Sequence, residues 1–121
     1  MKKIPSISSS ELEVLQILWQ AGKPLKIQEI CDSLQNENWK YNTVGTFLIR
    51  MEEKGAVISH KQNRTKYYKP LVNQEDYKQA QTKNLISKLY NGSVKDLAVS
   101  LFKSNEMTKE DIAEIRRMFN L

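Results

Sequence analysis

Hydrophobic residues recur at helical spacing in three segments of the N-terminal half of the chain. The first segment, residues 8–21, opens with a capping box in which Glu11 stands three residues after a serine. The second covers residues 26–34 and lacks a good N-cap residue. In the third, residues 41–54, apolar residues stand at i, i+3, i+4 and i+7, and Gly55 follows. The pattern predicts three helices.

Two β-prone runs follow the third predicted helix. Residues 56–61 and 65–71 flank the short polar segment 62–64, which is typical of a hairpin. Three helices followed by a hairpin is the order of a winged helix-turn-helix. The sequence therefore predicts a winged-helix DNA-binding domain over residues 1–72.

Beyond Pro70 the pattern is helical only. Asn73, Ser93 and Thr108 each precede an aspartate by three residues, as N-caps do, and Asn91-Gly92 interrupts the series. The fold class that follows is mainly α with a small β-hairpin wing, and residues 73–121 form a C-terminal helical dimerisation region.

The three C-terminal helices together have fewer than about fifty residues, and a bundle of that size rarely buries a sufficient core alone. A second copy of the chain would complete the core, so we expect a homodimer. An intramolecular core is the alternative, and both can hold. The dimer-core candidates are Leu85, Leu89, Leu101, Phe102, Ile112, Ile115 and Phe119.

The composition excludes several function classes. The 121 residues include one cysteine and one histidine, so we expect no disulfide framework, metal cage or catalytic triad. No glycine-rich phosphate loop is present either, so we expect a protein that is not an enzyme. We also expect it to need no metal or cofactor and to be cytoplasmic. Cys31 lies on an apolar stripe, where a buried, inert thiol is expected.

The net charge of +5 is unevenly distributed. Residues 1–72 contain eleven basic and seven acidic residues, whereas residues 73–121 contain eight and seven. Between Lys54 and Lys69 there are five basic residues and no acidic one. Charge alone fits a solvated edge hairpin as well as a DNA-binding wing. The helix order favours DNA.

The third predicted helix has a polar face that suits the major groove. Thr43, Thr46 and Arg50 lie three and four residues apart, although Arg50 could instead pair with Glu53. Asn42 fits a helix cap or a base contact equally well. The candidate DNA-binding residues, including those of the wing, are Lys40, Tyr41, Asn42, Thr43, Thr46, Arg50, Lys61, Arg64 and Lys66.

These motifs together resemble the penicillinase-repressor family of bacteria, which includes BlaI, MecI and copper-responsive CopY-type repressors. The resemblance covers residues 7 to about 119. Its carriers are Ile7-Ser8-x-x-Glu11, Ile17-Leu18-Trp19, the run from Trp39 through Thr43-Val44-Gly45-Thr46 to Met51, Lys54-Gly55, Lys66-Tyr67-Tyr68 and Leu89-Tyr90-Asn91-Gly92-Ser93.

The resemblance implies a homodimeric repressor that binds palindromic operators in double-stranded DNA. In the antibiotic-responsive members, a membrane sensor protease leads to cleavage of an Asn–Phe bond in the C-terminal region. Ser100-Leu101 stands at the aligned position here and is the candidate cleavage bond. Copper-responsive members have a C-terminal cysteine cluster, whereas residues 116–121 contain no cysteine, so copper sensing by that route is not expected.

Gly45 departs from the family pattern, because members usually have a longer polar residue there. Glycine within a helix costs about 1 kcal/mol relative to alanine. Either the backbone approaches DNA closely at this position, or one base contact is missing.

A winged-helix protein-interaction module without DNA binding is the alternative to the repressor function.

Overall fold

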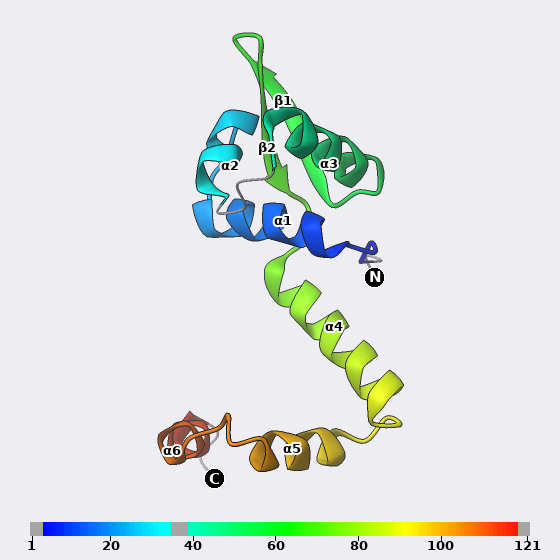
Figure 1. Cartoon of the computed structure of the whole chain (residues 1–121), viewed down its shortest axis with the longest axis vertical. Coiled ribbons are helices and arrows are strands. Elements are labelled where there is room, and N and C mark those ends of the chain that lie inside the picture. Colours follow the sequence, from blue (N-terminus) through cyan, green and yellow to red (C-terminus); the bar gives the residue numbers. More distant parts are fainter. Residues whose placement is uncertain (1–3, 35–38, 119–121) are drawn as a thin grey trace. The chain divides into compact units, whose positions relative to one another are not determined.

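The structure is a computed structural model that describes residues 4–34 and 39–118 (Figure 1). Its elements are α1 (Ser9–Ala21), α2 (Ile27–Ser33), α3 (Tyr41–Glu53), β1 (Val57–Gln62), β2 (Thr65–Pro70), α4 (Gln74–Leu89), α5 (Val94–Lys103) and α6 (Lys109–Met118). The mainly helical fold and the order of three helices and a hairpin are confirmed. By its contacts, the chain divides into two compact units, Met1–Lys78 and Gln79–Leu121.

The capping box at the start of α1 is present. The Ser8 hydroxyl accepts a hydrogen bond from the Glu11 N–H at 3.1 Å, and the Glu11 carboxylate accepts one from the Ser8 N–H at 2.9 Å. At the other end of α1, Gly22 has φ 66°, the left-handed conformation that glycine adopts without steric cost. Local sequence signals therefore set both ends of this helix.

The core of the first unit lies between α1, α2, α3 and the hairpin. Each element contributes the stripe or face that its hydrophobic period predicts, and burial of each large side chain stabilises the fold by about 1.5–3 kcal/mol. The fully buried side chains include Val14, Leu15, Leu18, Ile30, Val44, Leu48 and Met51.

The hairpin is antiparallel and is held to the helices by a third segment. Val57 pairs with Pro70, and the register continues to Gln62 opposite Thr65. Leu25, between α1 and α2, exchanges two backbone hydrogen bonds with Tyr68, at 2.9 and 2.7 Å. Tyr68 is buried, whereas its neighbour in the strand projects from the opposite face. The wing is thus fixed at its base, and its tip projects beyond the helices (Figure 1).

The first turn of α4 packs on the first unit. The Trp19 indole N–H donates to the Val72 carbonyl at 2.8 Å, and the Trp19 and Tyr77 ring centroids are 5.8 Å apart. Tyr77 is buried. These contacts extend the first compact unit to Lys78. The boundary between DNA-binding and dimerisation regions at residue 72 stays a prediction.

In the second unit, helix starts are set by side-chain caps. The Ser93 hydroxyl accepts from the Asp96 N–H at 3.1 Å, and the Thr108 hydroxyl accepts from the Asp111 N–H at 3.0 Å. Both caps agree with the sequence prediction. Neither α5 nor α6 buries a residue. Up to residue 118, where the described part ends, the helices of this unit form without a buried core in a single chain.

Candidate nucleic-acid interface

The face of α3 opposite the core stripe is polar and exposed. Asn42, Thr46 and Arg50 are exposed on it, and Thr43 is half-buried at its edge. Among the described residues, Arg50 forms no ion pair with Glu53 or with any other carboxylate. The predicted polar face is therefore present, and the Arg50 guanidinium on it is available to a partner.

The Thr46 hydroxyl is hydrogen-bonded within α3. It donates to the Asn42 carbonyl at 3.0 Å, so the hydroxyl hydrogen is already used and the methyl group and oxygen lone pairs remain for a partner. Asn42 is the second residue of the helix, and Lys40 occupies the N-cap position. The interpretation of Asn42 as a helix cap is wrong, and its base-contact role stays a prediction.

The start of α3 is suited to an anion. Among the described residues, no side chain caps this helix, and Lys40 and Tyr41 are exposed beside its first turn. Free N–H groups and the helix dipole favour negative charge at a helix N-terminus. Phosphate is the anion that such a terminus typically accepts.

The tip of the hairpin concentrates positive charge. Asn63 and Arg64 form its two-residue turn with φ 52° and 70°, as in the type I′ turns that match strand twist. Lys61 and Lys66 are direct partners across the strands, on the same face as buried Val57. Three cations thus lie within a short hairpin tip, and two of them face each other.

A groove of about 390 Å³ separates this tip from α2 and the start of α3. It contains four cationic side chains and no acidic one. Its lining residues are Lys26, Ile27, Gln28, Tyr41, Lys61, Arg64, Thr65 and Lys66. The groove thereby brings together Tyr41 of α3 and the three predicted residues of the wing, whereas the other predicted residues at α3 do not line it.

Three exposed residues of this region were not predicted from the sequence. Lys26 and Gln28 line the groove, although the apolar stripe of α2 predicts only packing for that helix. Ile49 is 56% exposed on α3, one turn after Thr46. The signal for Lys26 was its position before the first helix of a helix-turn-helix, which crosses the DNA backbone. Ile49 is not predicted from the sequence because the pattern that indicates DNA contacts consists of polar residues.

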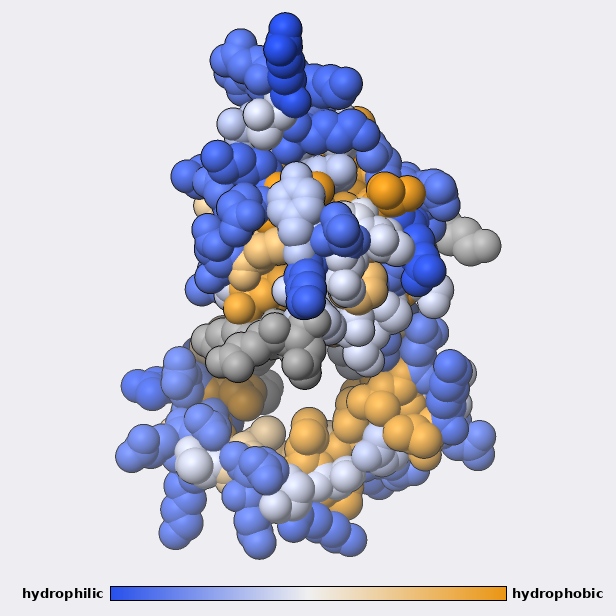
Figure 2. All heavy atoms as spheres, turned by 45° about the horizontal axis from the view of Figure 1, so that its top comes forward, coloured by the Kyte–Doolittle hydropathy of each residue, from blue (hydrophilic) through white to orange (hydrophobic). Residues whose placement is uncertain are grey.

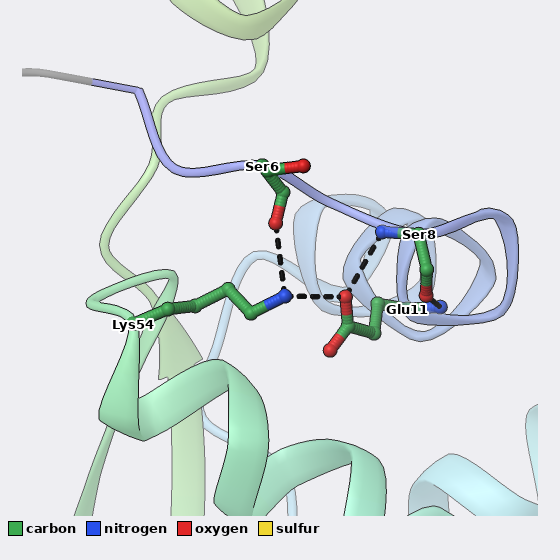
Figure 3. Close-up of polar contacts among 4 residues, drawn as sticks. All are labelled: Ser6, Ser8, Glu11 and Lys54. Carbon is green, nitrogen blue, oxygen red and sulfur yellow. Dashed lines mark hydrogen bonds and ion pairs between the residues drawn. The ribbon is translucent and has the colours of Figure 1, made fainter.

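Lys54 does not belong to the basic surface. Its ammonium group donates to the Ser6 carbonyl at 2.9 Å and to the Glu11 carboxylate at 2.8 Å (Figure 3). Glu11 is 4% exposed. The acid-free run from Lys54 to Lys69 therefore splits into a structural lysine and the cations of the wing.

The pKa of Glu11 lies below its ordinary value of 4.5. Burial by itself raises this pKa, but hydrogen bonds from Lys54 and from the Ser8 N–H and hydroxyl lower it by more. Glu11 is therefore ionised at neutral pH. The ion pair fixes the C-terminal end of α3 to the start of α1.

A second carboxylate joins α3 to the wing. Glu52 accepts a hydrogen bond from the Ser59 N–H at 3.0 Å and from the Ser59 hydroxyl at 2.8 Å. Ser59 belongs to β1. This contact sets the position of the hairpin relative to the exposed face of α3.

Cys31 and His60 show no arrangement for a reactive or metal site. Cys31 is half-buried, and burial, followed by the charge of Asp32, raises the pKa of its thiol. The His60 ring stacks on Tyr67 at 5.9 Å. Among the described residues, no three His, Cys, Asp or Glu side chains lie close enough to hold a metal ion.

The dimer-core candidates of the second unit are largely exposed. Leu89 is 70% and Phe102 56% exposed, and Leu85, Leu101 and Ile115 are also exposed. Ile112 is half-buried, and Phe119 lies outside the described residues. Figure 2 shows hydrophobic side chains on the surface of the α4–α6 part of the chain. A second copy as the covering partner stays a prediction.

The candidate cleavage bond lies within a helix. Ser100 and Leu101 belong to α5, and the Tyr90 hydroxyl donates to the Ser100 hydroxyl at 3.1 Å. A protease site binds its substrate in an extended conformation, so the residues around a helical peptide bond must first unfold. Cleavage at this bond would therefore require local unfolding of α5.

Among the helices that the structure describes, none combines the length and the apolar character that a membrane span requires.

Two solved structures of the repressor BlaI have the same winged-helix fold. A solution structure of the DNA-binding domain of BlaI matches 64% of this chain and 94% of that chain, with 37% identity and a TM-score of 0.54. A solution structure of monomeric Bacillus licheniformis BlaI in complex with the blaP half-operator matches to the same extent.

Sequence relatives extend the similarity to nearly the whole chain. The penicillinase repressor of Bacillus licheniformis is 30% identical over 95% of this chain and 90% of its own length. The methicillin resistance regulatory protein MecI of Staphylococcus aureus is 30% identical over 98% of this chain and 96% of its own. The family model described as penicillinase repressor matches residues 7–120. The chain belongs to the penicillinase repressor family.

Proposed function

We propose that the protein is a homodimeric, sequence-specific DNA-binding repressor of transcription. Helix α3 enters the major groove, and the hairpin of β1 and β2 contacts the DNA backbone. The observation that carries this function is the basic groove between the hairpin tip and α2, which reaches Tyr41 at the start of α3. The exposed polar face of α3 belongs to the same helix. Both surfaces belong to the first compact unit and can engage one duplex together.

The pairing of Lys61 with Lys66 supports a polyanionic partner. Like charges directly opposite in a hairpin destabilise it, unless an anion lies between or beside them. Arg64 adds a third charge in the turn. A phosphate in the groove would compensate this repulsion, and DNA supplies phosphates at regular spacing.

The comparison with BlaI supports the same function. Its DNA-binding domain shares 37% of the aligned residues, and that protein has been solved with a half-operator. Repression at operators is therefore the activity we assign to this chain. A protein-interaction module without DNA binding has no observation in its favour, because its surface would not require an acid-free groove.

The apolar surface of α4–α6 supports the homodimer. Leu89 and Phe102 expose large side chains that a second copy would cover. Two protomers would then place their α3 helices in successive major grooves, with half-sites about 34–36 Å apart or a multiple of that distance. The palindromic operator expected for the family matches this two-fold symmetry.

Sedimentation equilibrium tests the dimer. Phe102→Glu should shift the protein to monomers because the charge would be buried in the interface. Ile58→Glu changes an exposed isoleucine of the hairpin in the same way and should leave the dimer intact. Equal behaviour of both variants would contradict dimerisation through α5.

Release from DNA is proposed to follow cleavage between Ser100 and Leu101 by a membrane sensor protease. A repressor acts on the chromosome, so we propose that the protein works in the cytoplasm. Incubation with a sensor protease encoded beside the gene, followed by sequencing of the fragments, tests the bond. Fragments ending elsewhere would reassign it.

Fluorescence anisotropy with the DNA upstream of the chain's own gene tests the function itself. Binding should weaken steeply with salt, with a log–log slope of about −0.9 for each phosphate contact. Arg64→Ala should weaken binding to all sequences alike, whereas Thr46→Ala should weaken the operator preferentially. Absence of binding to this DNA, with no preference in a randomised duplex pool, would refute the repressor function.

A further inference from the structure

Ile49 is an apolar side chain on the polar face of α3. It is 56% exposed, whereas the isoleucine and leucines of the core are at most 5% exposed. It follows Thr46 by three residues and Asn42 by seven, so the three side chains lie on one side of the helix. Arg50 comes next in the chain and is also exposed. Ile49 therefore belongs to the surface that faces a groove of DNA when α3 is docked.

Thr46, one turn before Ile49, also has an apolar group to offer a partner. The Thr46 hydroxyl hydrogen is bonded back to the Asn42 carbonyl, which favours contacts through the threonine methyl group. Gly45, four residues before Ile49, has no side chain. A Cβ added at Gly45 would lie 3.7 Å from Ile27, so this position faces α2 and not the surface around Ile49. Ile49 and the Thr46 methyl group are thus two apolar groups on the exposed side of α3.

The cations around this surface identify the partner as DNA rather than another apolar protein surface. Lys40 lies at the start of α3, and Arg50 lies beside Ile49. The wing adds Lys61, Arg64 and Lys66. A helix that these cations hold against phosphates presents its exposed face to base edges in the major groove. Among the four bases, only thymine has an apolar group there, its C5-methyl.

We infer that Ile49 is a specificity-determining residue that contacts the C5-methyl group of a thymine in each half-site. The contact is apolar, so it contributes by removing methyl surface from water rather than by hydrogen bonding. Cytosine presents an amino group and no methyl near this position, and it loses the contact. This inference rests on the proposed function and names a base preference within it.

The experiment begins with a pool of duplex DNA that contains a randomised central segment. The full chain selects its preferred sequences from this pool, and the enriched duplex is then synthesised with deoxyuridine in place of each thymine in turn. Deoxyuridine lacks only the C5-methyl and keeps the base pair. At one thymine of each half-site, the substitution should weaken wild-type binding about fourfold, and about fifteenfold when both half-sites are changed.

Ile49→Ala supplies the second arm of the experiment. The side chain is exposed and alanine is the better helix former, so the variant should fold. It should bind the thymine duplex more weakly than wild type and should not distinguish thymine from deoxyuridine at that position. Ile58→Ala changes an exposed isoleucine of the hairpin and should keep the full sensitivity to the methyl group.

The outcomes separate this inference from the function beneath it. Enrichment of a sequence, with methyl sensitivity lost only in Ile49→Ala, supports the inference. Enrichment with no methyl sensitivity in wild type, or with the same sensitivity in Ile49→Ala, overturns it and leaves the repressor function standing. No enrichment by the folded wild-type protein overturns both.

Discussion

Lys61 and Lys66 lie directly opposite each other in the antiparallel hairpin, on the face that borders the basic groove. Cross-strand partners have close Cβ atoms, so two ammonium groups there repel each other. The free protein therefore contains a charge arrangement that is unfavourable for its own stability and favourable for binding an anion. This relationship predicts opposite effects of one substitution on stability and on DNA affinity.

Lys66→Gln should raise the free energy of unfolding by about 0.5 kcal/mol, because it removes the like-charge pair. DNA affinity should fall, and the salt slope should become less steep by about 0.9 for each protomer. Urea denaturation and anisotropy measure the two effects. Lys69→Gln, opposite Ile58 on the other face, should change neither. Unchanged DNA affinity in Lys66→Gln would remove this lysine from the interface.

Lys54→Met should destabilise the protein by about 2–4 kcal/mol, because the buried Glu11 carboxylate loses its cation. The salt slope of DNA binding by the folded variant should stay as in wild type. Lys69→Met provides the exposed control and should keep wild-type stability. A lowered salt slope in Lys54→Met would show that this lysine contacts phosphate after all.

Glu11→Gln should reduce the dependence of stability on acidic pH. The folded-state pKa of Glu11 is lower than the ordinary 4.5, so the unfolded chain binds the proton more readily than the folded protein. The stabilising contribution is complete above about pH 4.5 and is lost as the pH falls through the lowered pKa.

Urea denaturation at a series of acidic pH values measures this contribution. The exposed Glu13 on the same helix is the control, and Glu13→Gln should retain the wild-type pH profile. If Glu11→Gln also retained that profile, the ion pair with Lys54 would not govern acid stability.

Gly45→Ala should raise the free energy of unfolding by about 1 kcal/mol, because alanine is the better helix former. Its methyl group would make an ordinary contact with Ile27, at 3.7 Å, and would point to α2. We therefore expect DNA affinity to remain within about twofold of wild type, well under the 1.4 kcal/mol of a tenfold change.

This substitution decides between the two interpretations of Gly45. A large loss of affinity in the stabilised variant would mean that the backbone approaches DNA closely there. Gly22→Ala is a matched control for the glycine effect. Gly22 has φ 66°, so alanine there should destabilise the protein.

Local signals in the sequence were sufficient for the secondary structure. The capping box at Ser8 and Glu11, the caps at Ser93 and Thr108, and the helical period of α3 act over three or four residues. Their effect does not depend on the rest of the chain, so the order of helices and hairpin could be predicted. The order of these elements indicated the winged helix, and the family resemblance then indicated the repressor function.

Contacts between distant residues were beyond these signals. Lys54 and Lys66 belong to one acid-free run, yet Lys54 pairs with Glu11 and Lys66 borders the groove. Ile49 is apolar like the core residues, but it lies outside the buried stripe of α3 and is exposed. Which lysine meets a carboxylate, and which isoleucine meets solvent, depends on how α1, α3 and the hairpin pack. Charge and hydropathy along the chain describe each residue alone, whereas pairing and exposure arise only when the elements come together in three dimensions.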